Sequence, residues 1–329
     1  DVEHEALRRI KAYHWPGNVR QLINAIERAK IMADDNVVRV RDLPREVIQG
    51  RTGGRRPASV AGAGLESVPP AVPAEDEEVS REMERCFRKR GIGVRTGAEV
   101  QRAAVGPEGV EVTFATGGQG KTETLNAEAL LLGVGRRPAG GSLGLERTRV
   151  VLEKGYVKTD AFHRTAEPGV YAVGDLVGRA PLAHVASHEA VAAVETMAGE
   201  KPHPIQYDQV PWCTYCDPEV ARVGLTERQA RERGFAVKTG KFPFTALGRA
   251  LILGENEGFV KVVADEKYGE VLGVHIIGPR ATESIAEGAA LLHLESTTEE
   301  ILATVHAHPT LSEALAEAAL DVLGRSINR

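Results

Sequence analysis

The sequence predicts an α/β protein made of several parts, and three observations lead to this prediction. Residues 1–50 have helical patterns, residues 51–78 have no regular pattern, and strand and helix patterns alternate from residue 79 onward. The composition of the 329 residues, with 42% hydrophobic and 26% charged side chains, is ordinary for a globular protein. We therefore expect a small helical bundle, a linker and a larger α/β portion.

The first 78 residues divide into a helical segment and a linker. In NVRQLINAIERAKIM the apolar side chains from Val19 to Ala29 recur at helical spacing, and Asn18 is a suitable N-cap after a Pro-Gly turn. Residues 51–78 are rich in Gly, Pro, Ala and charge, so they bury too little apolar surface to offset their ordering entropy. We predict that this stretch is a flexible linker and a domain boundary.

Three parts are expected after the linker, over residues 79–140, 141–207 and 208–329. A helix should end at Gly91, and GVEVTFATGGQGKTETLNA should form a hairpin that leads into a buried strand at Ala129–Gly133. The last part is long enough for a core of its own. Its predicted strands are VARVGL, FAVKTGKF, GFVKVVAD and EVLGVHIIG, and its predicted helices are TERQARERG, ATESIAEGAALLHLE, TTEEILATV and TLSEALAEAALDVL.

Composition excludes several classes of partner. The net charge of −5 argues against nucleic acid or an anionic membrane as the main partner. No apolar run approaches the ~20 residues that span a bilayer, and the opening DVEHEALRRIKAYHW is charged rather than signal-like. Three cysteines do not make a secreted disulfide framework. A cytoplasmic location is therefore expected.

The segment TVHAHPTLSEA near the C-terminus contains candidate catalytic residues. Thr310 and Glu313 have capping-box spacing, which would make Glu313 a helix-capping residue. Glu313 could instead pair with His308 and stabilise its charged form, which suits deprotonation of a thiol near neutral pH. A His-x-His metal pair is a weaker alternative because no third ligand is in register, so no metal is expected.

A second candidate site follows the strand-like segment AEPGVYAVGD. Its Gly174 allows close backbone approach, and the carboxylate of Asp175 suits a ribityl or ribose hydroxyl. An ordinary Gly-Asp turn explains the same two residues.

Two further motifs favour structural interpretations. Cys213 and Cys216 have redox-motif spacing, but they lie next to a strand pattern, and ordinary packed thiols explain them better. ATGGQGKTET lacks the first glycine of a phosphate-binding loop, because Ala115 stands there. A hairpin turn is the preferred interpretation.

Several ordered segments after residue 80 resemble the pyridine-nucleotide disulfide oxidoreductases. They are LLLGVGRRPA, YAVGD with the following LAH, DPEVARVGLTE, KFPFTALGRAL, GEVLGVHIIGPRATESI and TVHAHPTLSEA. The double-histidine form HAHPT is similar to the dihydrolipoamide dehydrogenase branch of that family. The resemblance implies partial nicotinamide- and flavin-binding domains over 79–140 and 141–207 and a dimerisation domain over 208–329.

The same resemblance implies roles for individual residues. Asp175, beside Gly174, would hold the ribityl chain of FAD; Ala183 and His184 would lie along the flavin, and Gly135 near NAD. His308 and Glu313 would be the acid–base pair that acts across the interface of a homodimer on the partner's disulfide. The implied substrate is dihydrolipoamide or a related thiol.

The N-terminal segment has a resemblance of its own. YHWPGNVRQLINAIERA is similar to the helical lid of AAA+ transcription activators that work with the enhancer-dependent sigma factor, and this resemblance covers residues 1–50. It implies that Arg20 senses nucleotide phosphates, although the 329 residues themselves contain no ATPase core.

Parts of the oxidoreductase pattern are missing from the sequence. The 329 residues contain no Gly-x-Gly-x-x-Gly turn and no redox cysteine pair of the family's wider spacing. We expect a truncated oxidoreductase that is inactive alone, joined to an AAA+ lid by a natural fusion or a mis-joined reading frame. The alternatives are a dimerisation module only, or a fragment of an AAA+ activator.

Overall fold

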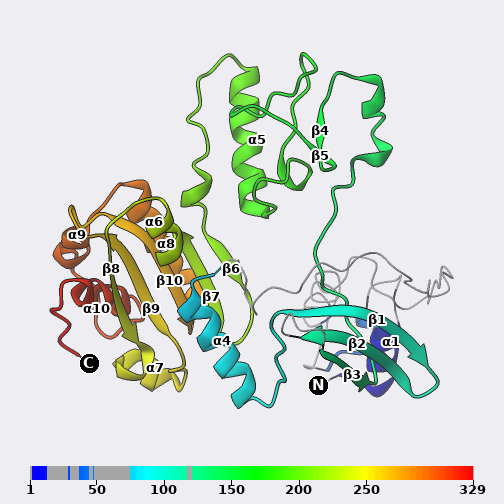
Figure 1. Cartoon of the computed structure of the whole chain (residues 1–329), viewed down its shortest axis with the longest axis horizontal. Helices are drawn as coiled ribbons and strands as arrows, with labels where there is room; N and C mark the ends of the chain where they lie inside the picture. Colours follow the sequence, from blue (N-terminus) through cyan, green and yellow to red (C-terminus); the bar gives the residue numbers. More distant parts are fainter. Residues whose placement is uncertain are drawn as a thin grey trace. The chain divides into compact units, whose positions relative to one another are not determined.

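The computed structural model describes residues 2–12, 29, 37–43, 47, 75–116 and 121–328. The chain forms two compact units, residues 1–63 and residues 64–329 (Figure 1). The helix predicted after Asn18, with Arg20, lies outside the described residues except for Ala29, and so does most of the predicted linker.

The first unit contains a small apolar cluster. Helix α1 (His4–Ala12) and the short 3-10 helix η1 (Val40–Asp42) are joined by a parallel bridge between Val2 and Val38. The buried side chains are those of Ala6, Ile10, Ala29, Val38, Leu43 and Val47.

The second unit begins with helix α4 (Glu77–Lys89), which confirms the helix predicted before Gly91. Asp76 caps it by accepting a 3.0 Å hydrogen bond from the backbone N–H of Glu78. Acidic residues occupy the first turn and basic residues the last, which complements the helix dipole. Gly91, with a φ of 77°, ends the turn that follows.

A three-stranded antiparallel sheet follows α4. Its strands are β1 (Ala98–Gly106), β2 (Gly109–Thr116) and β3 (Lys121–Ala127), in the order β1-β2-β3. Thr116 pairs with Lys121, so a strand stands where a phosphate-binding loop requires a helix. This pairing confirms the predicted hairpin; its residues 117–120 lie outside the described ranges.

The prediction of a buried strand at Ala129–Gly133 is wrong. This segment has no regular secondary structure, and the side chains of Leu131 and Leu132 are 82% and 61% exposed. A buried strand of a parallel sheet needs hydrogen-bonded neighbours on both sides. No strand within the described ranges pairs with this segment, so its apolar character alone did not make it a strand.

The middle of the second unit has little sheet. Strands β4 (Leu152–Glu153) and β5 (Tyr156–Val157) form a short hairpin. Helix α5 (Ala183–Met197) confirms the helix predicted in LAHVASHEAVAAVETMAG. The single-turn 3-10 helices of this region are η2 (Gly140–Ser142), η3 (Leu145–Arg147), η4 (Gly174–Leu176) and η5 (Tyr207–Gln209).

A five-stranded antiparallel sheet dominates the rest of the unit, in the order β6-β7-β10-β9-β8 (Figure 1). Four of its strands match the predicted patterns, because each alternates or runs apolar over a short, turn-bounded segment. The strands are β6 (Trp212–Thr214), β7 (Glu219–Gly224), β8 (Val237–Pro243), β9 (Phe259–Asp265) and β10 (Val271–Gly278).

Helices cover this sheet and complete its core. Helix α8 (Ala281–His293) packs on β7 and β10, and α10 (Glu313–Val322) packs on β8 and β9. Gly240 in β8 lets the backbone of α10 approach the sheet closely, since a Cβ there would lie 2.1 Å from the carbonyl oxygen of Ala318. The shorter helical segments are α6 (Glu227–Glu232), η6 (Phe244–Ala246), α7 (Gly248–Leu253) and α9 (Thr298–Ala303).

Helix α4 also packs on this sheet, through an apolar cluster and buried charges. Val79 and Met83 meet Val220, Phe259 and Ile277. The residues just before the helix are charged and buried, although they fall in the stretch expected to be a linker. Their partners lie 147 and 185 residues further along the chain, so no local pattern marks them as buried.

Lys261 is the centre of the charged contact. Its side chain is 2% exposed, and its Nζ lies 3.1 Å from both carboxylate oxygens of Asp76. The same ammonium lies 2.9 Å from Glu78 and 2.8 Å from Glu227. These anions hold the pKa of Lys261 above its usual range despite burial, which lowers it. The ammonium is therefore charged and fully paired.

Glu75, the residue before Asp76, pairs with Arg222 of the sheet, and its protonation should make the stability of this unit depend on pH. Burial raises the pKa of its carboxyl to about 7, although Arg222 lies 3.0 Å away and lowers it. The folded chain thus binds this proton more tightly than the unfolded chain does. The contribution of Glu75 to stability should be greatest below its ordinary value of 4.5 and should fall as the pH rises to about 7.

We predict that Glu75→Gln removes this dependence. The wild type should lose stability relative to the variant between about pH 4.5 and 7, by up to about 3 kcal/mol. Urea unfolding of both proteins at several pH values measures the difference. Parallel curves for the two proteins would show that Glu75 does not titrate in this window.

Candidate functional site

Of the predicted acid–base residues, His308 lies in the segment between α9 and α10, and Glu313 is the first residue of α10. His308 Nδ1 is 2.8 Å from Glu313 Oε1, and the other carboxylate oxygen of Glu313 accepts a 2.8 Å hydrogen bond from the backbone N–H of Thr310. The hydroxyl of Thr310 donates to Ala307 O instead of capping the helix. One half of the predicted capping box is therefore present, and Glu313 contacts both His308 and the helix start.

The electrostatics of this pair favour a charged carboxylate and an imidazole that can act as a base. Burial raises the pKa of Glu313, but the Thr310 N–H, His308 and His306 together lower it below its usual range. An ionised carboxylate beside Nδ1 requires a proton on Nδ1, which leaves Nε2 to accept one. The His308 side chain is 79% exposed, so Nε2 is accessible to a second molecule.

The two histidines of the His-x-His motif contact different carboxylates, His306 that of Glu287 and His308 that of Glu313. His306 Nε2 lies 2.7 Å from Glu287 Oε1, and its side chain is 8% exposed. Within the described part of the chain, no group of three or more His, Cys, Asp or Glu is placed to hold a metal ion. Glu287, on α8, was not found from the sequence, because no motif connects it with the histidines.

Asp175, in the segment predicted to contact the flavin, lies next to the segment that contains Arg136. Asp175 Oδ2 accepts a 2.7 Å hydrogen bond from Arg136, whose second terminal nitrogen donates to Pro181 O at 2.7 Å. Arg136 follows Gly135, which has a φ of 111° and open space around its Cα. The structure thus brings Asp175 close to the segment that contains Gly135, and Arg136 connects them.

The backbone of Gly174 is hydrogen-bonded to a buried carboxylate. It has a φ of 76°, and its N–H donates a 2.5 Å hydrogen bond to Glu189 of α5. Glu189 is 1% exposed and also accepts a 2.7 Å hydrogen bond from the Tyr207 hydroxyl. Burial, together with this carboxylate, raises the pKa of Tyr207 to about 12. Sequence reasoning missed Glu189, whose signal is a lone acidic residue among the small apolar residues of a helix.

The other predicted flavin contacts lie at the start of α5. Ala183 is its first residue, and His184 Nε2 lies 3.0 Å from the carbonyl oxygen of Pro211. This contact ties α5 to the segment that enters β6. A role of either residue in flavin binding stays a prediction.

The Cys-x-x-Cys motif has the features of packed thiols. Cys213 lies in β6, and both it and Cys216 are free and partly buried. Burial raises the pKa of each thiol, whereas a reactive cysteine needs a lowered pKa. These observations favour the structural interpretation.

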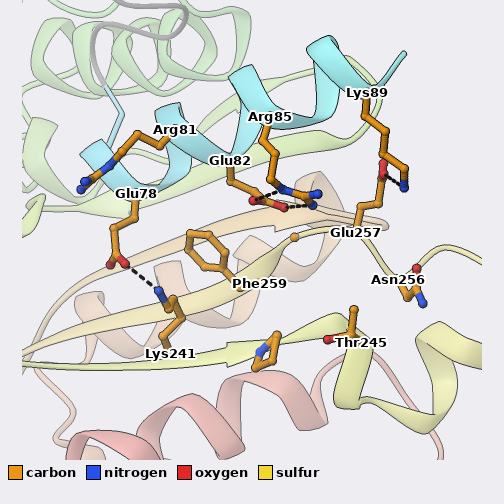
Figure 2. Close-up of a pocket in the computed structure, with 12 residues that line it drawn as sticks. Glu78, Arg81, Glu82, Arg85, Lys89, Lys241, Thr245, Asn256, Glu257 and Phe259 are labelled. Atoms are coloured by element: carbon orange, nitrogen blue, oxygen red, sulfur yellow. Dashed lines mark hydrogen bonds and ion pairs between the residues drawn. The ribbon is translucent and has the colours of Figure 1, made fainter. Parts of the chain in front are cut away.

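A groove between α4 and strands β8 and β9 contains none of the predicted site residues. It has a volume of about 670 Å³, and Figure 2 shows that all of its labelled charged side chains except Arg81 pair with one another. The pairs are Lys241 with Glu78, Arg85 with Glu82, and Lys89 with Glu257. The remaining cation of the groove, Arg81, lies 3.9 Å from Glu77 outside it. Most of the lining charge is therefore already paired and is not left for a ligand.

Comparison with known protein families identifies the two larger parts of the chain. Residues 64–190 match the pyridine nucleotide-disulphide oxidoreductase family, and residues 210–319 match its dimerisation domain. The chain belongs to the pyridine nucleotide-disulphide oxidoreductases. Residues 1–59 match the AAA+ ATPase lid domain, which agrees with the N-terminal resemblance.

Curated relatives and solved structures support this assignment. Dihydrolipoyl dehydrogenase of Bacillus subtilis is 40% identical over 311 residues, which are 92% of this chain and 66% of the relative. That of Chlorobaculum tepidum is 44% identical over 259 residues, 79% of this chain and 55% of the relative. LpdA from Mycobacterium tuberculosis superposes with a TM-score of 0.67 and 31% identity, over 75% of this chain and 53% of LpdA. The flavoprotein disulfide reductase RclA from Escherichia coli gives 0.69 and 25%, over 78% and 58%.

These matches confirm the predicted family and the predicted α/β fold with partial redox and dimerisation domains. The family uses FAD and NAD, the two cofactors implied by the sequence motifs. The chain spans only about 55 to 66% of the length of the two curated relatives. Within its described residues no helix is both long and apolar enough to cross a membrane.

We predict that Tyr207→Phe destabilises the second unit by about 1–3 kcal/mol, because it leaves a buried oxygen of Glu189 without its donor. Urea unfolding followed by circular dichroism measures the change. Tyr215→Phe is the matched control, since Tyr215 is 83% exposed, and it should have almost no effect. Equal effects of the two substitutions would contradict a structural role for the Tyr207 hydroxyl.

Proposed function

We propose that this chain supplies the dimerisation domain and part of the cofactor-binding region of a dihydrolipoyl dehydrogenase-like disulfide oxidoreductase, with His308 and Glu313 as its acid–base pair. The observation that carries the proposal is the 2.8 Å contact between His308 Nδ1 and Glu313 Oε1, beside an exposed imidazole. A family dimerisation domain over residues 210–319 supports it.

The proposed chemistry at this pair is the transfer of a thiol proton. His308 Nε2 accepts the proton from the S–H group of dihydrolipoamide or a related thiol, so an N–H bond forms as the S–H bond breaks. Glu313 stabilises the resulting imidazolium through Nδ1. The thiolate left behind is the nucleophile for a disulfide.

The residues near Asp175 fit the polyhydroxyl part of FAD. Its carboxylate is 53% exposed and accepts one hydrogen bond from Arg136, so it retains lone pairs for hydroxyl groups. Bound FAD and NAD would supply the electron acceptors for the thiol oxidation. The open space at Gly135 is compatible with a nearby cofactor.

We further propose that residues 208–329 form a homodimer, and that His308 acts across the same interface on a disulfide when the partner subunit carries the family's redox cysteine pair. The exposure of the His308 side chain in the single chain supports this arrangement. The cytoplasmic location stays a prediction. A pure dimerisation module is the second candidate, and the missing Gly-x-Gly-x-x-Gly turns and redox cysteine pair favour it for the chain as given.

We predict that the purified chain is dimeric and contains little or no flavin. Light scattering after size exclusion measures the mass, and visible absorbance measures bound flavin. A monomer would contradict the proposed dimerisation. A yellow protein that reduces NAD with dihydrolipoamide would show that these 329 residues suffice for the whole reaction.

A heterodimer tests the acid–base role separately. The chain is co-expressed with dihydrolipoyl dehydrogenase of Bacillus subtilis whose own acid–base histidine is replaced, and the mixed dimer is purified through two different tags. We predict that the mixed dimer reduces NAD with dihydrolipoamide. His308→Gln should lower its kcat by about 10²–10⁴-fold, because the proton acceptor is lost.

The matched control is His188→Gln, which changes an exposed histidine on α5 and should leave the rate unchanged. An active mixed dimer that is insensitive to His308→Gln would overturn the assigned role. Failure to isolate a mixed dimer would count against an interface shared with this relative.

A further inference from the structure

The turn that leads into α10 contains a hydroxyl in the place of a backbone donor. Thr310 Oγ1 donates a 2.6 Å hydrogen bond to the carbonyl oxygen of Ala307, three residues earlier. In an ordinary β-turn, the backbone N–H of the fourth residue donates to the carbonyl of the first. Here the Thr310 N–H donates to Glu313 Oε2 at 2.8 Å instead. The hydroxyl thus satisfies the carbonyl, and the N–H stays available for the carboxylate.

The hydroxyl of Thr310 is also held from the start of α10. A threonine hydroxyl donates one hydrogen bond and accepts others through its lone pairs. Because its proton is used on Ala307 O, the 3.2 Å contact with Ser312 Oγ requires Ser312 to donate. Ser312 is the N-cap of α10 and makes no side-chain cap bond to the helix. Two contacts therefore fix the direction of the Thr310 hydroxyl.

The two carboxylate oxygens of Glu313 have different partners. Oε2 accepts from the Thr310 N–H, and Oε1 lies 2.8 Å from His308 Nδ1. The terminal torsion of a glutamate is only weakly restrained by itself, so hydrogen bonds set the direction of the carboxylate. Burial raises the pKa of the Glu313 carboxyl, and the Thr310 N–H is the strongest of the groups that lower it below its usual range.

We propose that Thr310 is a positioning residue of the acid–base pair: its hydroxyl occupies Ala307 O, which leaves its N–H to hold Glu313 with Oε1 directed at His308. The inference rests on the proposed function of that pair, and Thr310 acts only through Glu313. Valine has nearly the shape of threonine but no hydroxyl. In Thr310→Val, Ala307 O should therefore compete for the N–H of residue 310, and the carboxylate should lose one of its two fixed contacts.

The hydrogen bond of the residue 310 amide can be measured without enzymatic activity. The full chain is labelled with ¹⁵N, and the amide proton shift of residue 310 is recorded at neutral pH with and without Glu313→Gln. We expect Glu313→Gln to move this signal in the wild type, because a neutral amide oxygen is a weaker acceptor than a carboxylate. The same substitution should hardly move it in Thr310→Val, and Thr310→Ser should restore the wild-type response.

Thr304→Val is the matched control. It removes a hydroxyl that also donates to a backbone carbonyl, that of Glu300 at 2.8 Å, and it should leave the response of residue 310 unchanged. If Thr310→Val does not fold, Thr310→Ala serves in its place. A hydroxyl-free variant whose amide responds to Glu313→Gln as the wild type does would overturn the proposal. A wild-type amide that does not respond would overturn it too, whatever the variants show.

The mixed dimer with the Bacillus subtilis relative gives the catalytic readout. Thr310→Val should lower its kcat by about 10- to 100-fold with KM unchanged, because a misdirected Glu313 no longer orients His308. Thr310→Ser should recover most of the rate, and Thr304→Val should keep all of it. Equal rates for wild type and Thr310→Val in an active mixed dimer would overturn the positioning role.

The two measurements separate this inference from the proposed function. A hydroxyl-dependent amide response together with an inactive mixed dimer would support the arrangement around Thr310 and contradict the acid–base function. A hydroxyl-independent response together with an active mixed dimer that needs His308 would overturn the inference and support the function.

Discussion

The contact between Lys261 and the start of helix α4 holds together the parts of the second unit that are most distant in sequence. Asp76 and Lys261 are separated by 185 residues, yet both are almost completely buried. Asp76 has two functions, since it caps α4 and neutralises the ammonium. Loss of the Lys261 ammonium would leave the buried Asp76 carboxylate without its cation, at a cost of about 3–5 kcal/mol. A charged contact of this kind specifies one docking position, whereas the apolar side chains of α4 alone would tolerate several.

Local patterns predicted the dimerisation domain well and the region before it less well. Strands such as β9 and β10 are short, apolar and bounded by turns, so their identity follows from nearby residues. Ala129–Gly133 has the same apolar character but no neighbouring strand within the described ranges, and it is exposed. Composition placed Glu75 and Asp76 in a linker, and no local pattern could correct this because their partners lie 147 and 185 residues away. Composition is a property of one segment, whereas its burial depends on which other segments of the chain pack against it.

The same distinction holds for the candidate site. His308 and Glu313 are five residues apart, and their contact was expected from spacing and family resemblance. Glu287 and Glu189, in contrast, lie on other helices and were not found from the sequence. Glu287 contacts His306, and Glu189 accepts a hydrogen bond from Gly174. The sequence therefore predicts the groups that do the chemistry better than the groups that hold them in place. The flavin and nicotinamide contacts stay predictions.

The position of helix α10 depends on a residue without a side chain. Gly240 in strand β8 lets the backbone of the helix sit against the sheet, because even one added carbon would collide with Ala318 O. Glu313 is the first residue of that helix, so the distance between the helix and the sheet determines where the Glu313 carboxylate lies. Sequence variation at Gly240 is thus coupled to the chemistry of a distant histidine. Among homologues, drift at this strand position should require compensating changes along α10 before the His–Glu pair could be retained.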